Sequence, residues 1–427
     1  MNKTINQTLQ NHLCTGCGIC EDVCSTRSIE IKHINGEHHP VLNKATCLSP
    51  KCGKCLKVCP GIGVNLVQMA QAFYTEDGTK ENKYIGRYKE TYTGHSLDED
   101  VRYHSASGGL VSQFLIYLLE KKTIEGAVVT GFSEQDHITP VSYIARTKED
   151  VIKARSSKYC PVALNKVGNE VTQSEGKYVI IGLPCHIQGF RKRAAIDKRF
   201  REKVIGYFSI YCSSNRSFYA QDYLLQKYSV DRRSISYFAY RDNGCLGNMV
   251  VQQGREFPSH TTKKSTKSMI SIPYTHYYGA LRSFFKPRRC LTCVDHYGEL
   301  ADICFGDIHI KPYSDDMVGT SSCIVRNDYW NIQMYKAVKD GYITLVPIDA
   351  HTLNESQKEM LYPKMRKAQA LMNLDKTILR RQVVVYDKEL DKPSVKDYVS
   401  VIVTNAQRFI GRHRSLWFLI KWLNKNR

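Results

Sequence analysis

Two cysteine runs near the start of the chain decide the fold of that region. Residues 14–24 read Cys-Thr-Gly-Cys-Gly-Ile-Cys-Glu-Asp-Val-Cys, and residues 47–60 read Cys-Leu-Ser-Pro-Lys-Cys-Gly-Lys-Cys-Leu-Lys-Val-Cys-Pro. The first run has the spacing C-x2-C-x2-C-x3-C, and the second has C-x4-C-x2-C-x3-C-P. Two-residue gaps let thiolates on a tight loop point inward while backbone N–H groups turn toward the sulfides of a cluster. The spacing therefore indicates iron–sulfur chemistry, rather than a zinc ribbon or disulfides.

The residues between the two runs predict a β-hairpin. Residues 28–34 alternate apolar and polar side chains up to Asn35-Gly36, and this dipeptide favours a type I′ turn. Such a hairpin would pair the two halves of the segment about a pseudo-twofold axis.

The whole segment resembles the two-cluster bacterial ferredoxins, in which each run gives three thiolates to its own [4Fe-4S] cluster and the fourth to the other. The resemblance implies one cluster bound by Cys14, Cys17, Cys20 and Cys59, and a second bound by Cys47, Cys52, Cys55 and Cys24. The chain departs from the ferredoxin pattern in two places. Four residues separate Cys47 from Cys52 instead of two, and Ser25 stands where a proline often follows the first run.

Composition narrows the class of protein. A chain of 427 residues with ordinary hydrophobic content predicts two or three domains, and 16 cysteines are too few for a disulfide scaffold of this length. The first residues carry no apolar signal segment, no run reaches membrane-spanning length, and iron–sulfur ligands need a reducing compartment, so we expect a cytoplasmic protein. The net charge of +20 would attract nucleic acid, an anionic membrane or an acidic protein.

The middle of the chain predicts an α/β domain. Residues 125–132, 177–183 and 204–211 are short apolar runs that alternate with helical patterns. Cys185 and Cys212 follow two of these strands, where ligands bind in such folds, and Cys290 and Cys293 form a CxxC pair. Four soft ligands result, although a redox CxxC or a zinc site is the alternative. Residues 240–242 have the composition of a loop.

A serine- and glycine-rich turn, residues 104–109, precedes an amphipathic helix. The N-terminus of a helix offers free N–H groups and a positive dipole to an anion, so the turn is typical of an anion site. A tight packed turn is an equally good interpretation of the same residues.

Five motifs occur in order behind the ferredoxin-like segment. They are Ser105-Ala106-Ser107-Gly108-Gly109-Leu110, Ser157-Lys158-Tyr159, Gly182-Leu183-Pro184-Cys185, Cys290-Leu291-Thr292-Cys293, and Ala301-Asp302 with Gly306-Asp307. Together they resemble the family of coenzyme F420 hydrogenase/dehydrogenase beta subunits over about residues 10 to 310. The resemblance implies an iron–sulfur flavoprotein oxidoreductase, in which clusters exchange electrons with FAD and the flavin acts on a deazaflavin or another organic substrate.

The same resemblance implies the site residues. A third [4Fe-4S] cluster would bind Cys185, Cys212, Cys290 and Cys293, whereas Cys160, Cys245, Cys304 and Cys323 match no ligand motif and are expected to be core or incidental thiols. Contacts to FAD would come from Ser105, Ser107, Gly108, Gly109, Arg155, Lys158, Gly306 and Asp307. The candidates for the catalytic acid are His104, His186 and Asp307.

These observations predict three regions: an α+β ferredoxin-like domain over residues 1–65, an α/β core domain over residues 84–312, and a mainly helical, basic region over residues 313–427. The tail from residue 395 onward is aromatic and basic, which favours either contact with an anionic membrane or acidic partner, or a helix packed back on the protein.

We expect three kinds of partner: an acidic electron carrier such as a ferredoxin or flavodoxin, a redox subunit, and a small-molecule substrate. The alternative function is an electron-transfer subunit without a substrate of its own. Nucleic-acid binding is not expected, because the basic residues are scattered and form no recognisable binding motif.

Overall fold

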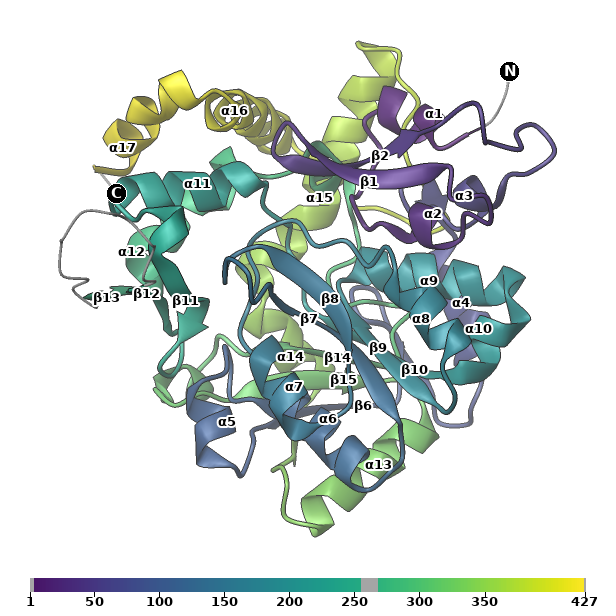
Figure 1. Cartoon of the computed structure of the whole chain (residues 1–427), viewed down its shortest axis with the longest axis vertical. Helices are drawn as coiled ribbons and strands as arrows, with labels where there is room; N and C mark the ends of the chain where they lie inside the picture. Colours follow the sequence, from purple (N-terminus) through teal and green to yellow (C-terminus); the bar gives the residue numbers. More distant parts are fainter. Residues whose placement is uncertain (1–3, 255–267, 426–427) are drawn as a thin grey trace, which may run out of the picture.

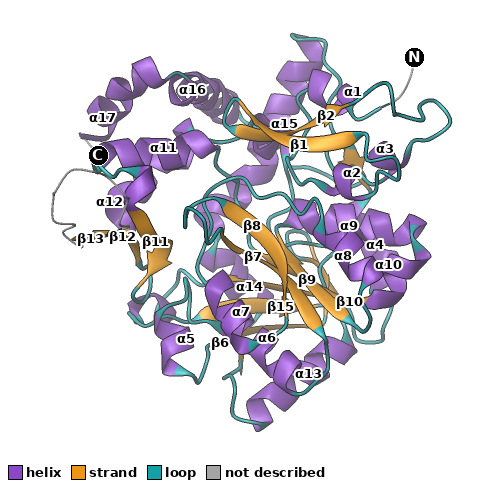
Figure 2. Cartoon of the chain, viewed as in Figure 1, coloured by secondary structure: helices purple, strands orange, loops and turns teal. Residues whose placement is uncertain are grey.

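The computed structural model describes residues 4–254 and 268–425, and a mixed eight-stranded sheet lies at its centre (Figures 1 and 2). The strand order is β16-β6-β15-β14-β10-β9-β7-β8. The bounds are β6 Glu90–Gly94, β7 Gly126–Phe132, β8 Pro140–Ala145, β9 Tyr178–Gly182, β10 Val204–Ile210, β14 Ile303–Asp307, β15 Ser321–Val325 and β16 Val346–Pro347.

Four neighbouring strands of the sheet, β7, β9, β10 and β14, run parallel. Strand β8 closes one side in the antiparallel direction, and β15, β6 and β16 continue the other side with alternating direction. The carboxyl ends of β9, β10 and β14 therefore meet at one edge, which we call the carboxyl edge. The register pairs Asp307 with Ser321, and Ser321 with Gly94, so the end of β6 and the start of β15 lie at this edge too.

Helices cover both faces of the sheet. Helices α6 (Leu110–Glu120), α7 (Lys148–Ala154) and α13 (Asp328–Lys339) bury apolar side chains against one face. Helices α4 (Leu66–Phe73), α8 (Val167–Gln173), α9 (Pro184–Ile196) and α10 (Lys198–Lys203) cover the other. Strand residues alternate between the two cores, with Val128 and Ile180 on one side and Val129 and Val179 on the other, as the period of two requires.

The N-terminal segment forms the hairpin that its sequence predicts. Strands β1 (Ile29–Ile34) and β2 (Glu37–Leu42) pair antiparallel, and Ile34 lies opposite Glu37. The turn residues Asn35 and Gly36 have φ of 51° and 77°, which is the left-handed conformation of a type I′ turn. Short helices α1 (Asn6–Gln10), α2 (Ile19–Asp22) and α3 (Lys54–Lys57), with strand β3 (Gly63–Val64), complete the segment.

The second half of the chain adds a small sheet and a helical layer. Strands β11 (Ile235–Asp242), β12 (Asn248–Gln253) and β13 (Ser268–Pro273) pack with α11 (Phe218–Lys227) and α12 (Tyr274–Phe284). The last helices are α14 (Ala350–Ser356), α15 (Lys358–Thr377), α16 (Val395–Arg412) and α17 (Trp417–Lys425). Short strands β4 (Lys80–Asn82) and β5 (Gly86–Tyr88) and helix α5 (Glu99–Tyr103) connect the first two regions.

The structure differs from the sequence prediction in the region after residue 312. Strands β15 and β16 lie in the central sheet, so this region contributes to the core domain as well as forming helices. Strand β17 (Val385–Tyr386) also pairs in parallel with β3, and this pairing ties the C-terminal region to the N-terminal segment. Within the described part of the chain, no helix is both long and apolar enough to span a membrane.

Candidate functional site

Four cysteines of the N-terminal segment, which we call the inner quartet, lie together: Cys14, Cys17, Cys20 and Cys59. Burial raises the pKa of Cys20 well above its ordinary value, and the neighbouring thiolates of Cys17, Cys14 and Cys59 raise it further. Burial, with Cys59 next to it, also raises the pKa of Cys17 to about 11. The N–H of Gly16, a residue with φ of 73°, donates to Cys14 Sγ at 3.4 Å. The last cysteine of the second run thus joins three from the first.

The other four cysteines of the segment, the outer quartet, line a single pocket: Cys24, Cys47, Cys52 and Cys55. Ile29 and Leu42 of the hairpin line it as well. Burial raises the pKa of Cys55, with Cys52 and Cys47 among the neighbours that contribute, and the N–H of Ser28 donates to Cys24 Sγ at 3.3 Å. The longer loop before Cys52 does not remove Cys47 from the group.

A third set of thiols, the core quartet, comes from three elements of the α/β domain. Cys185 lies in the first turn of α9, Cys212 follows β10, and Cys290 and Cys293 lie on and just after a 3-10 turn over Arg288–Thr292. Burial raises the pKa of Cys185 well above its ordinary value, and Cys17, Cys212, Cys290 and Cys293 all add to the shift. The four cysteines that the family resemblance singled out are therefore brought together, and Cys17 of the inner quartet lies beside them.

Backbone groups and one lysine surround the core quartet. The N–H of Asn215 donates to Cys290 Sγ at 3.4 Å. Lys364 Nζ donates to the carbonyl of Asp295 at 2.7 Å and to that of Cys212. Burial raises the pKa of Cys212 to about 12, although the positive charge of Lys364 opposes the rise. A fixed positive charge beside the thiols favours their ionised form, which is the form that binds metal.

Polar contacts fix the inner quartet against the α/β domain. Arg193 of α9 forms an ion pair with Asp22, and both side chains are almost fully buried. The N–H of Leu164 donates to the Cys17 carbonyl at 2.9 Å, and Lys192 Nζ donates to the Cys59 carbonyl at 2.8 Å. The N-terminal segment is thus seated on the core domain through the residues that carry the inner thiols.

The predicted anion turn lies at the carboxyl edge of the sheet. Ser107 Oγ lies 3.4 Å from the Gly306 carbonyl and 3.2 Å from Ser321 Oγ. Gly108 and Gly109 both have positive φ, 86° and 72°, and a Cβ at Gly108 would meet the carbonyl of Gly319. Residues 105–109 and 306–307 therefore converge. The side chain of Ser105 is buried, and its hydroxyl has no hydrogen-bond partner within the described residues.

An ion pair between Arg241 and Asp307 borders this turn, at 2.7 Å. Burial would raise the pKa of Asp307, but Arg241 and His309 hold it below its ordinary value. The N–H of Arg241 also donates to Ser156 Oγ at 3.2 Å, which links residues 155–159 to the same edge. Sequence reasoning missed Arg241 because residues 240–242 resemble a loop, whereas they end strand β11.

Three predicted flavin or catalytic residues have partners within the chain. Arg155 pairs with Asp100 at 2.7 Å. Lys158 Nζ donates to the carbonyls of residues 154, 155 and 156, and burial lowers the pKa of Lys158 to about 7. His186 is buried, lies 3.2 Å from the Val162 carbonyl, and has its pKa lowered by burial to about 4. Lys158 and His186 thus contact backbone carbonyls, whereas Arg155 is paired with a side chain.

The other candidates lie near the ion pair between Arg241 and Asp307. His104 Nδ1 is 2.6 Å from Asp242 Oδ1, next to Arg241 in the chain. His309, which the sequence did not single out, lies 3.7 Å from Asp307. Among the remaining thiols Cys160, Cys304 and Cys323 are fully buried in the core, as expected, and Cys245 lies 3.9 Å from the Arg241 guanidinium.

The described residues contain no group of three His, Cys, Asp or Glu side chains placed to hold a single metal ion. A [4Fe-4S] cube makes a different demand, because its four thiolates bind four different iron atoms and do not converge on one point.

Comparison with known proteins identifies the family of this site. Family models for the coenzyme F420 hydrogenase/dehydrogenase beta subunit match residues 91–168 (its N-terminal part) and 175–351 (its C-terminal part). The chain belongs to this family. A 4Fe-4S dicluster domain model matches residues 13–62, so the chain is an iron–sulfur protein of an oxidoreductase family. Residues from 352 onward lie outside all three matches.

Individual relatives agree with this assignment. The coenzyme F420 hydrogenase beta subunit of Methanosarcina barkeri is 24% identical over 63% of this chain and 85% of its own length. The coenzyme F420-dependent sulfite reductase of Methanocaldococcus jannaschii is 29% identical over 44% of this chain, but only 26% of that enzyme is matched. A chain in the solved F420-reducing [NiFe] hydrogenase complex of M. barkeri covers 71% of this chain and 98% of its own, with a TM-score of 0.54 and 22% identity, which shows a shared fold.

Proposed function

We propose that this chain is an iron–sulfur flavoprotein oxidoreductase, in which electrons pass between [4Fe-4S] clusters and an FAD that acts on an organic substrate or carrier. One observation carries the proposal: the core quartet lies between the inner quartet and the turn over residues 105–109 at the carboxyl edge. Cys17 lies beside Cys185 on one side. On the other side Tyr211, next to Cys212, donates its N–H to the Phe305 carbonyl at 2.8 Å, and its ring packs on Gly306.

The three quartets supply the chemistry that clusters need. We propose that the inner quartet, the outer quartet and the core quartet each bind one [4Fe-4S] cluster through four thiolates. Burial raises the pKa of Cys20 and of Cys185 well above the ordinary value, so binding a cluster must release the protons of these two thiols. The N–H donors at Cys14, Cys24 and Cys290 would stabilise the thiolates once they are ionised.

The turn over residues 105–109 at the carboxyl edge supports the proposal that a flavin diphosphate binds there. Two consecutive glycines with positive φ bring the backbone of residues 108–109 to the start of α6, and the orphaned hydroxyl of Ser105 is a buried donor there. FAD supplies the conversion between single-electron and hydride chemistry. We propose that Arg241 and Asp307 border the flavin. The donors of Lys158 and Arg155 already have partners within the chain. These two residues would therefore support the site by holding residues 154–158 in place.

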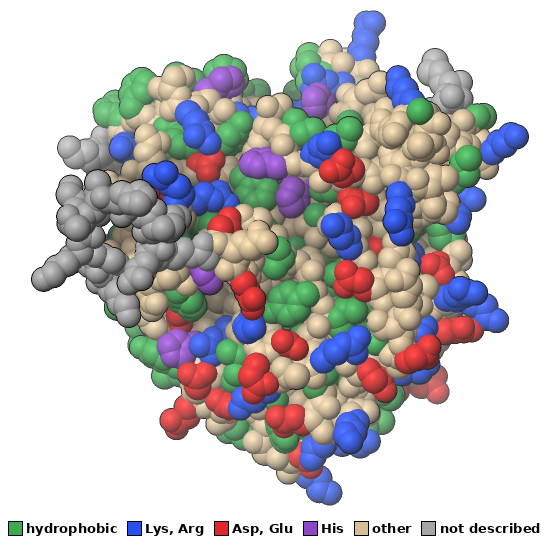
Figure 3. Space-filling view, in the orientation of Figure 1, with side chains coloured by type: hydrophobic (Ala, Val, Ile, Leu, Met, Phe, Trp, Pro, Cys, Tyr) green, Lys and Arg blue, Asp and Glu red, His purple; other side chains and the backbone are tan. Residues whose placement is uncertain are grey.

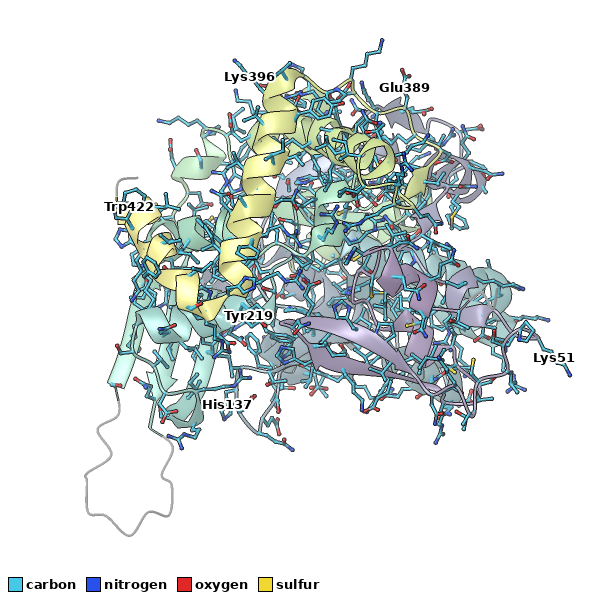
Figure 4. All side chains as sticks on the ribbon, turned by 90° about the horizontal axis from the view of Figure 1, so that it is seen from above. Lys51, His137, Tyr219, Glu389, Lys396 and Trp422 are labelled. Carbon is cyan, nitrogen blue, oxygen red and sulfur yellow. The ribbon has the colours of Figure 1, made fainter. Side chains whose placement is uncertain are left out.

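The outer quartet is placed to meet an electron-transfer partner. Lys54 lines its pocket, and the exposed Lys44, Lys51 and Lys57 lie within three residues of its cysteines in the chain. Figure 4 shows Lys51 projecting outward. Positive charge of this kind attracts an acidic protein and speeds its encounter. We propose an acidic carrier such as a ferredoxin or flavodoxin, or a partner redox subunit, as the docking protein, and a small molecule as the substrate at the flavin.

A second function is an electron-transfer subunit with no substrate of its own. It is favoured by the names of two relatives, the hydrogenase beta subunit and a subunit of the F420H2 dehydrogenase of Methanosarcina mazei, which mark them as parts of larger assemblies.

The deciding experiment is anaerobic purification followed by analysis of iron, sulfide and flavin. We expect three clusters and released FAD on denaturation. Arg241→Met should lose the FAD and keep the iron, whereas Arg146→Met should keep both. Arg146 is the matched control because its guanidinium bonds Tyr178 and Glu125 at the opposite edge of the sheet. Full iron without any flavin would favour the electron-transfer function, and an iron-free protein would contradict both.

A further inference from the structure

Helix α16 turns both polar and apolar residues to the protein. Its buried residues are Asp397, Val401, Arg408 and Gly411, and Tyr398 and Ile410 pack against apolar clusters of the core. Asp397 accepts from Arg366 Nε at 3.3 Å, and Arg408 Nε donates to the Lys286 carbonyl at 2.6 Å. Gly411 lies against the backbone of Phe284, where a larger residue has no room. A surface helix ordinarily buries most of its apolar residues, whereas α16 buries two charged residues and leaves several apolar ones exposed.

The outward side of α16 is apolar instead. Val395, Val399, Ile402, Val403 and Phe409 are all exposed, and their spacing places them on one side of the helix. Helix α17 continues the surface with the exposed Phe418 and Trp422. Figure 4 shows α16 lying across the molecule between Lys396 and the end of the chain that carries Trp422. Green side chains line the upper left edge in Figure 3, where Figure 1 places these helices.

This tail surface is also strongly basic. From residue 395 to the end, the sequence has seven Lys and Arg residues and a single acidic one: Lys396, Arg408, Arg412, Arg414, Lys421, Lys425 and Arg427 against Asp397. Asp397 and Arg408 are both buried, so the charge at the described surface comes from the exposed Lys396, Arg412, Arg414 and Lys421. The tail lies beyond the matches to the family, so the family's redox site gives no account of it.

A pocket lies beside this surface, between α11 and α17. Its lining includes Lys227, Arg414, Ser415 and Lys421, together with Trp417. Arg414 donates to Asp222 at 2.6 Å and Lys227 to the His276 carbonyl at 3.3 Å, whereas Lys421 forms no ion pair within the described residues. Two lysines, an arginine and a hydroxyl around one opening suit a phosphate group.

We propose that the outer sides of α16 and α17 dock on an anionic lipid bilayer, with a lipid phosphate received in the pocket beside Lys421. Helices that lie in a membrane interface have this composition: valine, isoleucine, phenylalanine and tryptophan next to lysine and arginine. A second copy of this chain suits the surface poorly, because two basic tails would repel each other. The proposal goes beyond the redox function and does not depend on it.

The test is co-sedimentation of the anaerobically purified full chain with vesicles. Vesicles of phosphatidylcholine and phosphatidylglycerol should bind the protein, and vesicles of phosphatidylcholine alone should bind at least tenfold less. Binding to the anionic vesicles should fall as salt is raised, because salt screens the charge attraction. Millimolar inorganic phosphate should not displace the protein from the vesicles. A free phosphate ion has no acyl chains, so it cannot replace the apolar contact that the bilayer makes with α16 and α17.

Matched variants distinguish binding through this surface from non-specific binding to vesicles. Ile402→Glu on α16 should reduce vesicle binding at least tenfold, whereas Ile332→Glu on α13 should leave it unchanged. The two isoleucines are similarly exposed, at 58% and 53%. Trp422→Ser on α17, compared with Tyr335→Ser on α13, is a second pair that tests the surface if Ile402→Glu does not fold. Lys421→Gln should weaken binding to anionic vesicles only.

Three outcomes would overturn the proposal. The first is no binding of the full chain to anionic vesicles. The second is equal loss in the α13 and α16 variants. The third is dimerisation that depends on protein concentration and is abolished by Ile402→Glu without vesicle binding, which would assign the surface to a second copy. Iron content should be the same in every variant, so a failure here is distinguishable from a failure of the redox proposal.

Discussion

The inner and outer quartets come from the same two cysteine runs, yet they occupy opposite environments. The inner thiols are largely buried and lie beside the core quartet, whereas the outer thiols line a pocket and have exposed lysines near them in the chain. The crossed grouping is the one that the resemblance to two-cluster ferredoxins implies. The contacts of Asp22 with Arg193 on α9 and with the N–H of Asn169 on α8, which we call the seat on α8 and α9, decide which group faces the core domain. The difference assigns the outer quartet to the partner and the inner quartet to the interior of the proposed relay.

Breaking the crossed grouping should have the largest effect. Cys59→Ser lies in the second run but should remove the first, inner cluster, because Cys59 lies with Cys14, Cys17 and Cys20. We expect each single-cysteine variant to lose about a third of the iron, one cluster of three. The measurement is iron analysis with reduced-state magnetic resonance.

The spectra give this prediction its sharpest form. The spectrum of Cys59→Ser should match that of Cys17→Ser, and the spectrum of Cys24→Ser should match that of Cys52→Ser. Cys160→Ser, a buried thiol outside the three quartets, is the control and should keep all of its iron. A Cys59→Ser protein that instead matches Cys52→Ser would show that each run binds its own cluster.

Loosening the seat of the inner quartet should have the next largest effect. Asp22→Asn removes the fully buried anionic partner of Arg193 and leaves only Asp197, whose carboxylate lies 3.3 Å from the guanidinium. We therefore expect a cost of about 3 kcal/mol, at the lower end for a broken buried pair. The midpoint of thermal unfolding should fall by several degrees, and electron transfer to the core cluster should slow. Glu202→Gln is the control, because its pair with Lys198 is exposed and is expected to contribute less than about 0.5 kcal/mol. Equal shifts in the two variants would contradict the seating.

Reversing the charge of the lysines near the outer quartet should weaken the attraction of an acidic partner and leave the fold intact. Lys51→Glu combined with Lys54→Glu should raise KM for an acidic ferredoxin about tenfold at low salt, because the attraction that steers the partner is lost. The effect should shrink as ionic strength rises. Lys336→Glu, on the exposed side of α13, should leave KM unchanged. A tenfold change in kcat with constant KM would place the partner elsewhere.

Local features of this fold could be predicted from sequence, and contacts between distant segments could not. The hairpin at Asn35-Gly36, strands β9 and β10 and helix α4 follow from alternation, apolar runs and turn chemistry within a few residues. The pairing of Arg241 with Asp307 joins two strands 66 residues apart, so no local pattern could reveal it. Strand β15 was missed as part of the sheet because its place depends on pairing with β14 and β6.

The same limit applies to the candidate sites. The spacing of the eight N-terminal cysteines indicates iron–sulfur chemistry, whereas their crossed grouping is what the resemblance to two-cluster ferredoxins implies. The family resemblance named the core quartet and the turn at residues 105–109. Composition could not show that the Lys158 ammonium donates to the carbonyls of residues 154, 155 and 156. The burial of two charged residues of α16 is likewise a property of its neighbours, because Arg366 and the Lys286 carbonyl hold Asp397 and Arg408 inward.

The smallest effect is expected at the turn of the hairpin that links the two quartets. Gly36 has φ of 77°, and a Cβ there would meet the ring of Tyr219 on α11. The Gly36 carbonyl accepts from the N–H of Phe218 at 2.7 Å, and the rings of His33 and His38 lie against Phe218. The hairpin is thus seated on α11 at its tip, just as the inner quartet is seated on α9.

Gly36→Ala should therefore combine two costs. A left-handed φ costs an alanine about 1 kcal/mol, and the contact with Tyr219 adds to it. Gly78→Ala is a matched control, because Gly78 has a similar φ of 74° and only the end of Lys89 nearby. Chemical denaturation of the two variants should show a larger loss for Gly36→Ala, with unchanged iron in both. Equal losses would mean that the contact of the hairpin tip with α11 adds no stability, so that the seat on α8 and α9 alone orients the inner quartet toward the core.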